Sequence, residues 1–531
     1  MDQTANYLPY ESTGYFSRIV SDYLSQSPQL KAFYQHTPDL EGIKASITAR
    51  QSFKNDRTLL VDVLQQQYTN IDQSEKLKKN IALLADQHTF TITTAHQPNI
   101  FTGPLYFIYK ILHAVKLADE LNTELPQYKF VPVYYMGSED ADLDELGYVI
   151  VGGQKLVWET KQTGAVGRMK VDKALLKLVE AIYGQIGVLP FGNEFTDLIK
   201  RCYQEGVTIQ QATLELVNAL FGEYGMVVLM PDNAKLKSAF HAVVEKELTE
   251  GFSHKAVADT IEQLGKNYKV QAAGRDINLF YLIDDKRERI ELQGSKYEVR
   301  TLGFSFSKDE ILQELKDHPE RFSANVILRG AFQETVLPNI AFIGGGGELA
   351  YWMELKKVFE AVQIPYPVLL LRNSFLMMNK AQANKWQKLG FTDSDLFKEE
   401  RTLMNTLVKR ESGHRLNLSR ELEEAHAFYV HLRSITDAVD KTLSAHLAAL
   451  EKKAIKRLTE LEKKLLRAER LKYEVQQKQI AKLKQDLFPN NSLQERLDNI
   501  SLHYATHGKG WLQMILDVST GLNKGFGIVT I

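Results

Sequence analysis

The chain has little cysteine, little net charge and no long uncharged apolar run. Its 531 residues include one cysteine, Cys202, which excludes an internal disulfide and a zinc site built from three or four thiolates, and indicates a reducing compartment. A formal net charge of -1 gives no general attraction to nucleic acid. No apolar run approaches the roughly 20 residues that span a bilayer, and residues 1–20 lack the pattern of a signal peptide. We expect a cytoplasmic protein with no nucleic-acid or membrane partner.

The most informative stretch is residues 90–111, which predicts a strand, a loop and a helix. A β-branched run stops at His96, and Pro104 fits the first turn of an amphipathic segment that Thr102 or Gly103 can cap. The free N–H groups and the positive dipole end of such a helix attract anions. The pattern therefore places an imidazole beside a phosphate or carboxylate, as an active site would.

Three further short apolar runs have the same character, at 129–135, 226–232 and 365–371. Short apolar strands separated by helical stretches predict an α/β fold with a parallel sheet covered on both faces. Ligands of such folds bind at the carboxyl ends of the strands. We expect one shared pocket from the polar residues that follow these ends, namely His96, Ser138, Glu139, Asp140, Asp232, Arg372, Asn373 and Ser374.

An acidic cluster follows the second strand, with five carboxylates in seven residues: Glu139, Asp140, Asp142, Asp144 and Glu145. If the chain stays extended, Asp140, Asp142 and Asp144 share one face, which suits Mg²⁺ or an ammonium group. If it turns helical, Glu139 and Asp142 pair instead. A general base for an incoming amine would come from this set. The alternative is a plain helical turn capped by Ser138 or Asp142.

A run of four glycines, Gly344–Gly347, leads into an amphipathic helix that starts with Glu348. Backbone N–H groups in such a run can curl around an anion, and a flexible connector has the same composition. The run matches neither the dinucleotide-binding glycine pattern nor a P-loop.

Residues 428–487 contain no glycine or proline, and they predict one long helix. Its apolar stripe consists of Leu447, Leu450, Ala454, Leu458, Leu461, Leu465 and Ala468, at spacings of three and four. We expect a dimeric coiled coil, with folding back on the chain's own core as the alternative.

Five blocks of sequence carry a resemblance, and they are AHQPNIFTGPLYFIYK, VPVYYMGSEDADLDE, NVILRGAFQETVLPNIAFIGGGGELAYW, PYPVLLLRNS and LFPNNSLQER. In this order they resemble the bacillithiol biosynthesis cysteine-adding enzyme family (BshC), over nearly the whole chain. The resemblance implies a cytoplasmic ligase that joins cysteine to glucosaminyl-malate in the last step of bacillithiol synthesis. It also implies a Rossmann-like core, similar to class I aminoacyl-tRNA synthetases and nucleotidylyltransferases, and a C-terminal coiled coil.

By this resemblance, His96 and Gly103 contact the phosphates of an ATP- or ADP-type nucleotide, and the acidic cluster holds Mg²⁺ or the amine. Arginine binds carboxylates bidentately, so Arg329 and Arg372 would hold the malate, unless Arg372 forms a surface salt bridge. Catalysis is assigned to His96, Glu139, Asp140 and Asp142. Substrate binding is assigned to Gln97, Gly103, Tyr106, Asp144, Arg329, Gly345, Gly346, Glu348, Tyr351, Arg372, Asn373 and Ser374, whereas Lys110 is expected to be solvated.

Two departures from the synthetase pattern leave the activation of the cysteine carboxyl open. Asn99 replaces the second histidine of the His-x-Gly-His signature, and no Lys-Met-Ser-Lys-Ser-like loop is found. The alternatives are a nucleotidylyltransferase acting on another small acceptor, or a coiled-coil scaffold with a nucleotide-binding core.

The expected segments follow from these readings. A helical part (1–88) and a first Rossmann segment (89–147) precede a connecting-peptide insertion (148–205) and a core segment (206–260). A second insertion (261–325) and core completion with the glycine run (326–425) precede the coiled coil (426–488) and a segment that packs on the core (489–531). Hairpins are expected at 148–172 and 268–299, with turns at Gly152-Gly153 and Asp284-Asp285.

Overall fold

The computed structural model describes residues 4–522 and 525–531, so residues 1–3 and 523–524 of the first and last predicted segments lie outside the described residues. The chain divides into two units. The first runs to Leu376 and includes Ser492–Val529, and the second is Met377–Asn491 with Thr530 and Ile531. Among the described residues, no helix combines the length and apolarity needed to cross a bilayer.

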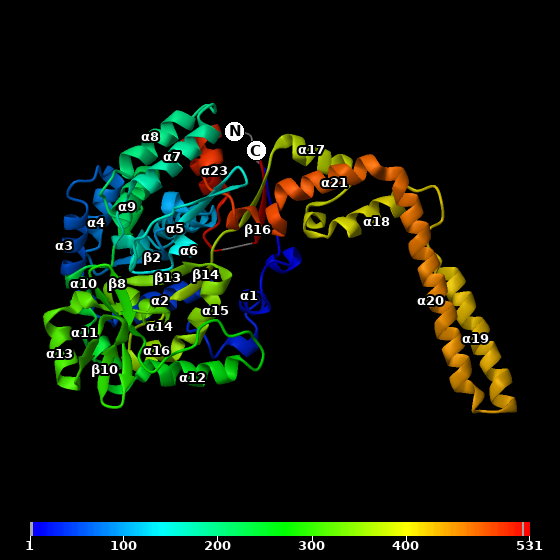
Figure 1. The fold of residues 1–531 in the computed structure, drawn as a ribbon, viewed down its shortest axis with the longest axis horizontal. Helices are drawn as coiled ribbons and strands as arrows, with labels where there is room; N and C mark the ends of the chain where they lie inside the picture. Colours follow the sequence, from blue (N-terminus) through cyan, green and yellow to red (C-terminus); the bar gives the residue numbers. More distant parts are fainter. Residues whose placement is uncertain (1–3, 523–524) are drawn as a thin grey trace. The chain divides into compact units, whose positions relative to one another are not determined.

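A five-stranded parallel sheet forms the centre of the first unit (Figure 1), with the order β14-β13-β2-β3-β6. Its strands are β2 (Thr89–His96), β3 (Lys129–Met136), β6 (Val227–Leu229), β13 (Asn339–Gly344) and β14 (Val368–Leu371). The chain runs outward from β2 to β3 and β6, then returns to β13 beside β2 and continues to β14. The order therefore reverses between β2 and β13, where doubly wound sheets bind their ligands.

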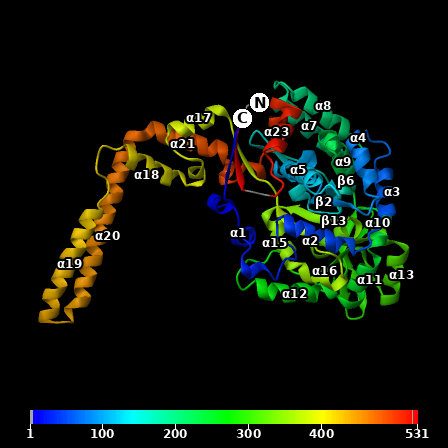
Figure 2. The same ribbon diagram turned by 180° about the vertical axis from the view of Figure 1, so that it is seen from behind.

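Helices cover this sheet on both sides (Figures 1 and 2). Helix α5 (Tyr106–Glu124) packs on β2 and β3, whereas α2 (Leu40–Gln51) packs on β13 and β14. Because helices lie on both faces, β2, β13 and β14 are buried along their whole length, which explains why none of them contains Asp, Glu, Lys or Arg. Helix α23 (Lys509–Val518) packs on α5 from outside, so most of α5 is buried too.

Both predicted hairpin regions contain hairpins. Strands β4 (Tyr148–Val151) and β5 (Gln154–Val157) pair across Gly152 and Gly153, which have φ of +56° and +80°. Positive φ at both turn positions gives the twist that a two-residue hairpin needs. The second region contains β7 (Leu279–Ile283), β8 (Lys286–Arg289), β9 (Glu291–Gln293) and β10 (Lys296–Val299), and β12 (Phe322–Ala324) pairs with β7.

The N-terminal part holds α1 (Arg18–Leu24), α2, α3 (Arg57–Gln67) and α4 (Glu75–Leu83). It also contains a strand that the sequence did not predict, β1 (Thr4–Leu8), in a separate sheet of order β1-β16-β15 with β16 (Phe526–Thr530) and β15 (Phe375–Met378). In the first unit, α22 (Ser501–His507) and α23 follow the return of the chain at Ser492.

The second unit contains a helical hairpin where the sequence predicted one long helix, and this prediction is wrong. Helix α19 (Ser419–Val439) ends before a short turn, and α20 (Leu443–Arg470) runs back beside it (Figure 1). Glu451 of α20 joins the two helices through a hydrogen bond with His426 Nδ1 (2.6 Å) and an ion pair with Arg433 (2.9 Å). The unit also holds α17 (Lys380–Lys388), α18 (Glu400–Glu411) and α21 (Glu474–Leu487).

Candidate active site

A cavity of about 1150 Å³ lies in the first unit, lined by residues that follow the carboxyl ends of the central strands. His96 comes from the end of β2, and Glu139 and Asp140 come from the loop after β3. Gly345–Glu348 follows β13, and Arg372 follows β14. The topological switch point between β2 and β13 therefore opens into one pocket, as predicted for His96, Ser138, Glu139, Asp140 and Arg372. Asp232, also predicted, lies outside the lining and pairs with Arg168 (2.6 Å).

His96 presents a neutral imidazole to this cavity. Its side chain is buried and packs edge-on against Tyr106, with ring centroids 5.3 Å apart. Burial, and then the charges of Lys110, Arg329 and Arg372, lower its pKa well below the usual value. Its Nε2 is buried without a hydrogen-bond partner among the described residues. An imidazole with one unused nitrogen on a cavity wall is placed to bind a ligand.

Lys110 is buried, so the expectation of a solvated side chain is wrong. Its Nζ donates to the carbonyl of Ala95 (3.0 Å) and pairs with Glu348 Oε2 at 2.5 Å. Glu348 also accepts the N–H of Gly345 (2.8 Å), which caps helix α15 (Gly346–Glu354). The Glu348 carboxylate is therefore engaged by its own helix and by Lys110, although the residue lines the cavity.

The glycine run forms a strand-to-helix turn without a left-handed residue. β13 ends at Gly344 and α15 begins at Gly346, and none of Gly344–Gly347 has a positive φ. The expected curl of the backbone is therefore replaced by the N-terminus of a helix. Gly345, Gly346 and Gly347 line the cavity, and a Cβ at Gly347 would meet no atom within 4 Å. Missing side chains leave the first N–H groups of α15 open to an anion.

The two predicted cations differ in their surroundings. Arg372 forms a buried ion pair with Glu495 (2.6 Å), whose side chains are 5% and 0% exposed, which excludes the surface salt bridge considered as its alternative. Arg329 is half-buried and donates from Nη2 to the Tyr351 hydroxyl (2.9 Å). No carboxylate of the described residues lies within 4.0 Å of the Arg329 guanidinium. Burial acts to lower the pKa of Arg329, but Tyr351 and the more distant charges of Glu348 and Asp140 raise it above the usual value.

The acidic cluster turns helical, so the expected extended face is not formed. Asp142 caps the short helix α6 (Leu143–Leu146) by accepting the N–H of Glu145 (3.1 Å). Asp142 and Asp144 are exposed and lie outside the cavity lining, whereas Glu139, Asp140 and Glu145 line it. The alternative pairing of Glu139 with Asp142 is also absent, because Glu139 pairs with Lys237.

Two family models together match nearly the whole chain. One describes the bacillithiol biosynthesis BshC N-terminal Rossmann-like domain and matches residues 3–373, and the other describes the BshC C-terminal coiled-coil domain and matches residues 375–531. The chain belongs to the BshC family. The fold is accordingly α/β, with a Rossmann-like core and a C-terminal coiled-coil domain.

Relatives named putative cysteine ligase BshC align along the full length. The one from Flavobacterium johnsoniae is 42% identical and that from Flavobacterium psychrophilum 40%, with 99% and 98% of both chains covered. The one from Bacillus cereus is 26% identical and covers 94% of this chain and 95% of its own.

Three BshC residues from the predicted site lie outside the cavity lining and instead hold the C-terminal segment. Asn373 exchanges two hydrogen bonds with the backbone of Thr520 (3.1 and 2.9 Å), and the carbonyl of Ser374 accepts the N–H of Gly527 (2.9 Å). The carbonyl of Gly103 accepts from Asn499 Nδ2 at 2.6 Å. The start of α5, expected to hold phosphate, is thus covered by a later part of the BshC chain.

The two BshC carboxylates that directly follow β3 in the cavity lining, Glu139 and Asp140, have different partners. Glu139 is held by Lys237 and by the Ser323 hydroxyl (3.2 Å), so both of its oxygens are engaged. Asp140 is half-buried and accepts hydrogen bonds from Gln97 Nε2 (3.1 Å) and from the N–H of Asp142 (3.3 Å), and no cation of the described residues lies within 4.0 Å of its carboxylate. Because Lys237 pairs with Glu139 and no cation pairs with Asp140, Asp140 is better placed than Glu139 to take a proton from a ligand.

The resemblance implied a nucleotide and Mg²⁺, and the residues of the site fit a nucleotide better than a resident metal ion. The open N–H groups of α15, His96 and Arg329 fit an anion such as a nucleotide phosphate. A resident metal does not fit as well, because no group of three or more histidine, cysteine or acidic side chains among the described residues could hold an ion. Cys202 is buried, which raises its pKa to about 12, so its thiol is inert.

Sequence reasoning missed several cavity residues of this BshC chain, among them Arg287 and Arg496. Arg287 lies in β8, where the sequence KRER places basic side chains two residues apart and so on one face. That alternation was the available signal. Arg496 follows the coiled-coil domain by sequence, and nothing local marks it as part of the cavity.

Proposed function

We propose that the chain is a cytoplasmic ligase that forms an amide bond between the carboxyl of L-cysteine and the amine of glucosaminyl-malate, which gives bacillithiol. The family and the names of the relatives support this activity. The observation that carries the proposal is Arg329, an ion-pair-free guanidinium beside neutral His96 at the switch point of the sheet. An unpaired cation on a cavity wall is compensated when an anionic ligand binds.

In this proposal the site brings an activated cysteine carboxyl to the acceptor amine. The amine nitrogen attacks the acyl carbon, the new C–N bond forms, and the bond from that carbon to its activating group breaks. Asp140 accepts the proton that the nitrogen loses. His96 and the first N–H groups of α15 bind the leaving anion, and fixed donors stabilise charge that develops during the step. A cavity of about 1150 Å³ is large enough for both reactants.

An ATP- or ADP-type nucleotide is the proposed source of activation. Its phosphates would lie at the N-terminus of α15, beside His96. Mg²⁺ would arrive with the nucleotide, because phosphate oxygens and water usually supply most of its ligands. Asp140 would be the carboxylate from the loop after β3 that contacts such an ion, since no described cation pairs with it while Lys237 pairs with Glu139.

We also propose that the second unit forms a homodimer through α19 and α20. These helices keep apolar side chains exposed even after pairing within one chain, including Phe428 (58%), Leu450 (42%) and Leu461 (46%). Apolar residues repeated along a helix at this exposure are typical of a coiled-coil contact.

Mass spectrometry of the full-length protein with cysteine, glucosaminyl-malate and MgATP, beside a tube without ATP, tests the activity. We expect the cysteinyl adduct and AMP in the complete tube alone. His96→Ala and Asp140→Asn should abolish the adduct. His88→Ala and Asp144→Asn are matched controls, because both residues are exposed and lie outside the cavity lining, and they should keep it.

Three results would contradict the proposal. Adduct formation that survives both cavity substitutions would show that these residues take no part in the reaction. Transfer of a nucleotide to the acceptor without cysteine would indicate a nucleotidylyltransferase instead. An unchanged bacillithiol content in cells that lack the protein would show that the protein is not needed for bacillithiol synthesis.

A further inference from the structure

The cations of the cavity differ in how their charge is balanced. Lys110 and Arg372 are buried, and each has a carboxylate at 2.5 to 2.6 Å. Arg287 and Arg329 are half-buried in the same cavity, and no carboxylate of the described residues lies within 4.0 Å of either guanidinium. The remaining arginines of the lining are exposed at its mouth, where water solvates them. Arg287 and Arg329 are thus the inner cations left without a counter-ion.

Arg287 is held rigidly by the second insertion. Its guanidinium lies over the ring of Phe280, 3.9 Å from the centroid, and its Nε donates to the Ser323 hydroxyl (3.1 Å). Nη2 reaches the carbonyl of Ala324 at 3.4 Å, and in the part of the chain that is described Nη1 has no recorded hydrogen bond. A guanidinium fixed by stacking and by one edge keeps its remaining donors for a ligand, with little entropy left to lose.

The charges near Arg287 leave room for an anion. Burial lowers its pKa, and the charge of Arg329 lowers it further, whereas Glu139 and Asp140 raise it. Glu139 is occupied by Lys237 and Ser323, so it does not neutralise Arg287. Two like charges that face one space repel each other until a ligand with negative charge enters between them.

We propose that Arg287 binds one carboxylate of the malyl part of the acceptor while Arg329 binds the other, so that the second insertion selects a four-carbon dicarboxylate. This inference rests on the function proposed above. Two separate guanidinium groups suit two planar carboxylates, since arginine donates a fork of parallel N–H groups that matches a carboxylate. Phosphate fits the N-terminus of α15 better, where backbone N–H groups converge. Arg372, which Glu495 neutralises, is then a structural residue and no part of malate binding.

Isothermal titration of the full-length protein with L-malate, with glucosaminyl-malate and with inorganic phosphate tests this assignment. Arg287→Gln and Arg329→Gln should each weaken both malate-containing ligands at least ten-fold. Arg287→Lys should weaken them as well, because an ammonium group loses the stacking on Phe280 and the fork. Lys286→Gln is the matched control on the same strand, because its side chain is 41% exposed and lies outside the cavity lining, and it should leave the affinities unchanged.

The outcomes separate this inference from the function on which it rests. Glucosaminyl-malate that binds equally well to the wild type and to folded Arg287→Gln and Arg287→Lys would overturn the role of Arg287 and leave the ligase intact. Phosphate that displaces L-malate and depends equally on Arg287 would overturn the dicarboxylate class. A wild type that binds neither malate-containing ligand would overturn the proposed function together with the inference. Thermal unfolding of each variant shows whether it is folded.

Discussion

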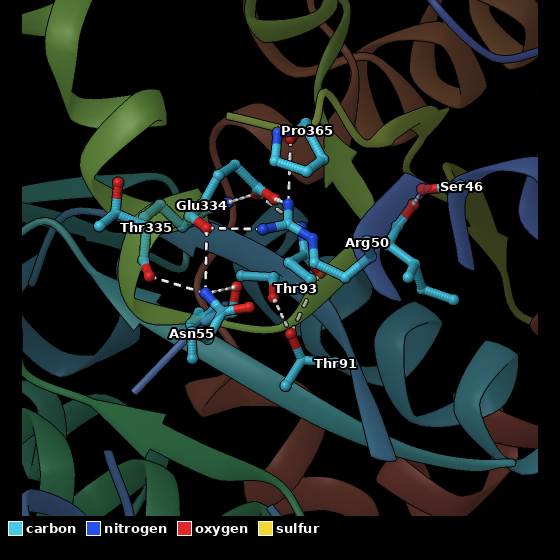
Figure 3. A network of polar contacts seen from close by, with 12 residues as sticks. Ser46, Arg50, Asn55, Thr91, Thr93, Glu334, Thr335 and Pro365 are labelled. Carbon is cyan, nitrogen blue, oxygen red and sulfur yellow. Dashed lines mark hydrogen bonds and ion pairs between the residues drawn. The ribbon is translucent and has the colours of Figure 1, made fainter. Parts of the chain in front are cut away.

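A buried ion pair holds helix α2 to the place where β13 begins, and its removal should destabilise the first unit strongly (Figure 3). Arg50 donates to the carbonyl of Glu334 (2.7 Å), to its carboxylate, and to the carbonyl of Pro365 (3.0 Å). The other carboxylate oxygen accepts from Asn339 (2.8 Å) and Gln333 (2.9 Å). The side chains of Arg50 and Glu334 are 1% and 0% exposed, so water cannot replace either partner.

Arg50→Met leaves the Glu334 carboxylate and the Pro365 carbonyl without their donor. Breaking a buried pair by removing one partner costs about 3–5 kcal/mol, because the remaining charge has no counter-ion. That is a large share of the roughly 5–15 kcal/mol by which a native domain is stable. We expect this loss at about pH 8, where the wild-type carboxylate is ionised.

The loss should depend on pH in a defined direction. Burial raises the pKa of Glu334 to about 7, while Arg50 acts to lower it, so the substitution raises that pKa further. Above pH 7 the native variant then keeps a proton that the native wild type has released, and the unfolded chains are identical. The variant therefore loses stability relative to the wild type as the pH rises above 7, by about 1.4 kcal/mol per pH unit up to its own pKa.

Urea unfolding followed by tryptophan fluorescence measures this loss, because Trp158, Trp352 and Trp511 report on the unit that contains the pair. Arg18→Met is the matched control. Arg18 pairs with Asp22 at 3.3 Å with its side chain 68% exposed, so its loss should stay below about 1 kcal/mol. An Arg50→Met variant within 1 kcal/mol of the wild type at pH 8, or one that loses more at pH 6 than at pH 8, would refute the reasoning.

Two further predictions concern acid stability and assembly. His113 accepts the N–H of Asn373 at Nδ1 (3.2 Å) and donates from Nε2 to Gly521 (2.7 Å), and burial lowers its pKa to about 4. On acidification the unfolded chain protonates His113 at a higher pH than the folded chain does, so stability is lost from about pH 6.5 to pH 4, by up to about 3 kcal/mol. His113→Gln should make the midpoint of thermal unfolding fall less steeply over that pH range. An equally steep fall in the variant would contradict this prediction. Replacing Leu458 and Leu461 with glutamate should give monomers in sedimentation. Lys456→Glu, at an exposed polar position, is the control and should leave dimers. A dimer that survives the double substitution would refute the coiled-coil contact.

The sequence predicted the sheet through strands that carry continuous apolar runs. β3, β6 and β14 are such runs and β2 is a β-branched run, and each closes on polar residues, so the cavity edge could be placed before the strand order was known. β13 was not identified, although it lies beside β2 in the centre. Its six residues, Asn339–Gly344, closely follow the apolar sequence of the preceding helix, and periodicity alone does not distinguish a buried strand from the end of a buried helix.

Contacts between distant residues explain most of the errors. Lys110 sits on a helix with a polar pattern at that position, but α23, about 400 residues later, covers the outside of α5 and Lys110 turns to Glu348. The break between α19 and α20 has a local cause instead. Asp440 accepts the N–H of Thr442 (2.8 Å) through its side chain, which competes with continuation of the helix. Without glycine or proline in the stretch, this was the only signal for the turn.

The arginines show the limit most clearly, because their sequence contexts cannot be ranked. Arg329 and Arg372 both lie in conspicuous blocks next to the core, and both were expected to hold malate. The partner that decides between them is Glu495, which is 123 residues beyond Arg372 and buried against it. Arg287 was overlooked because it comes from a charged hairpin that, read locally, resembles a solvated edge. Whether a cation is available to a ligand depends on which carboxylate the fold brings to it. For that reason composition and motifs located the cavity, and only the pairing of its charges identifies Arg287 and Arg329 as the groups left for substrate.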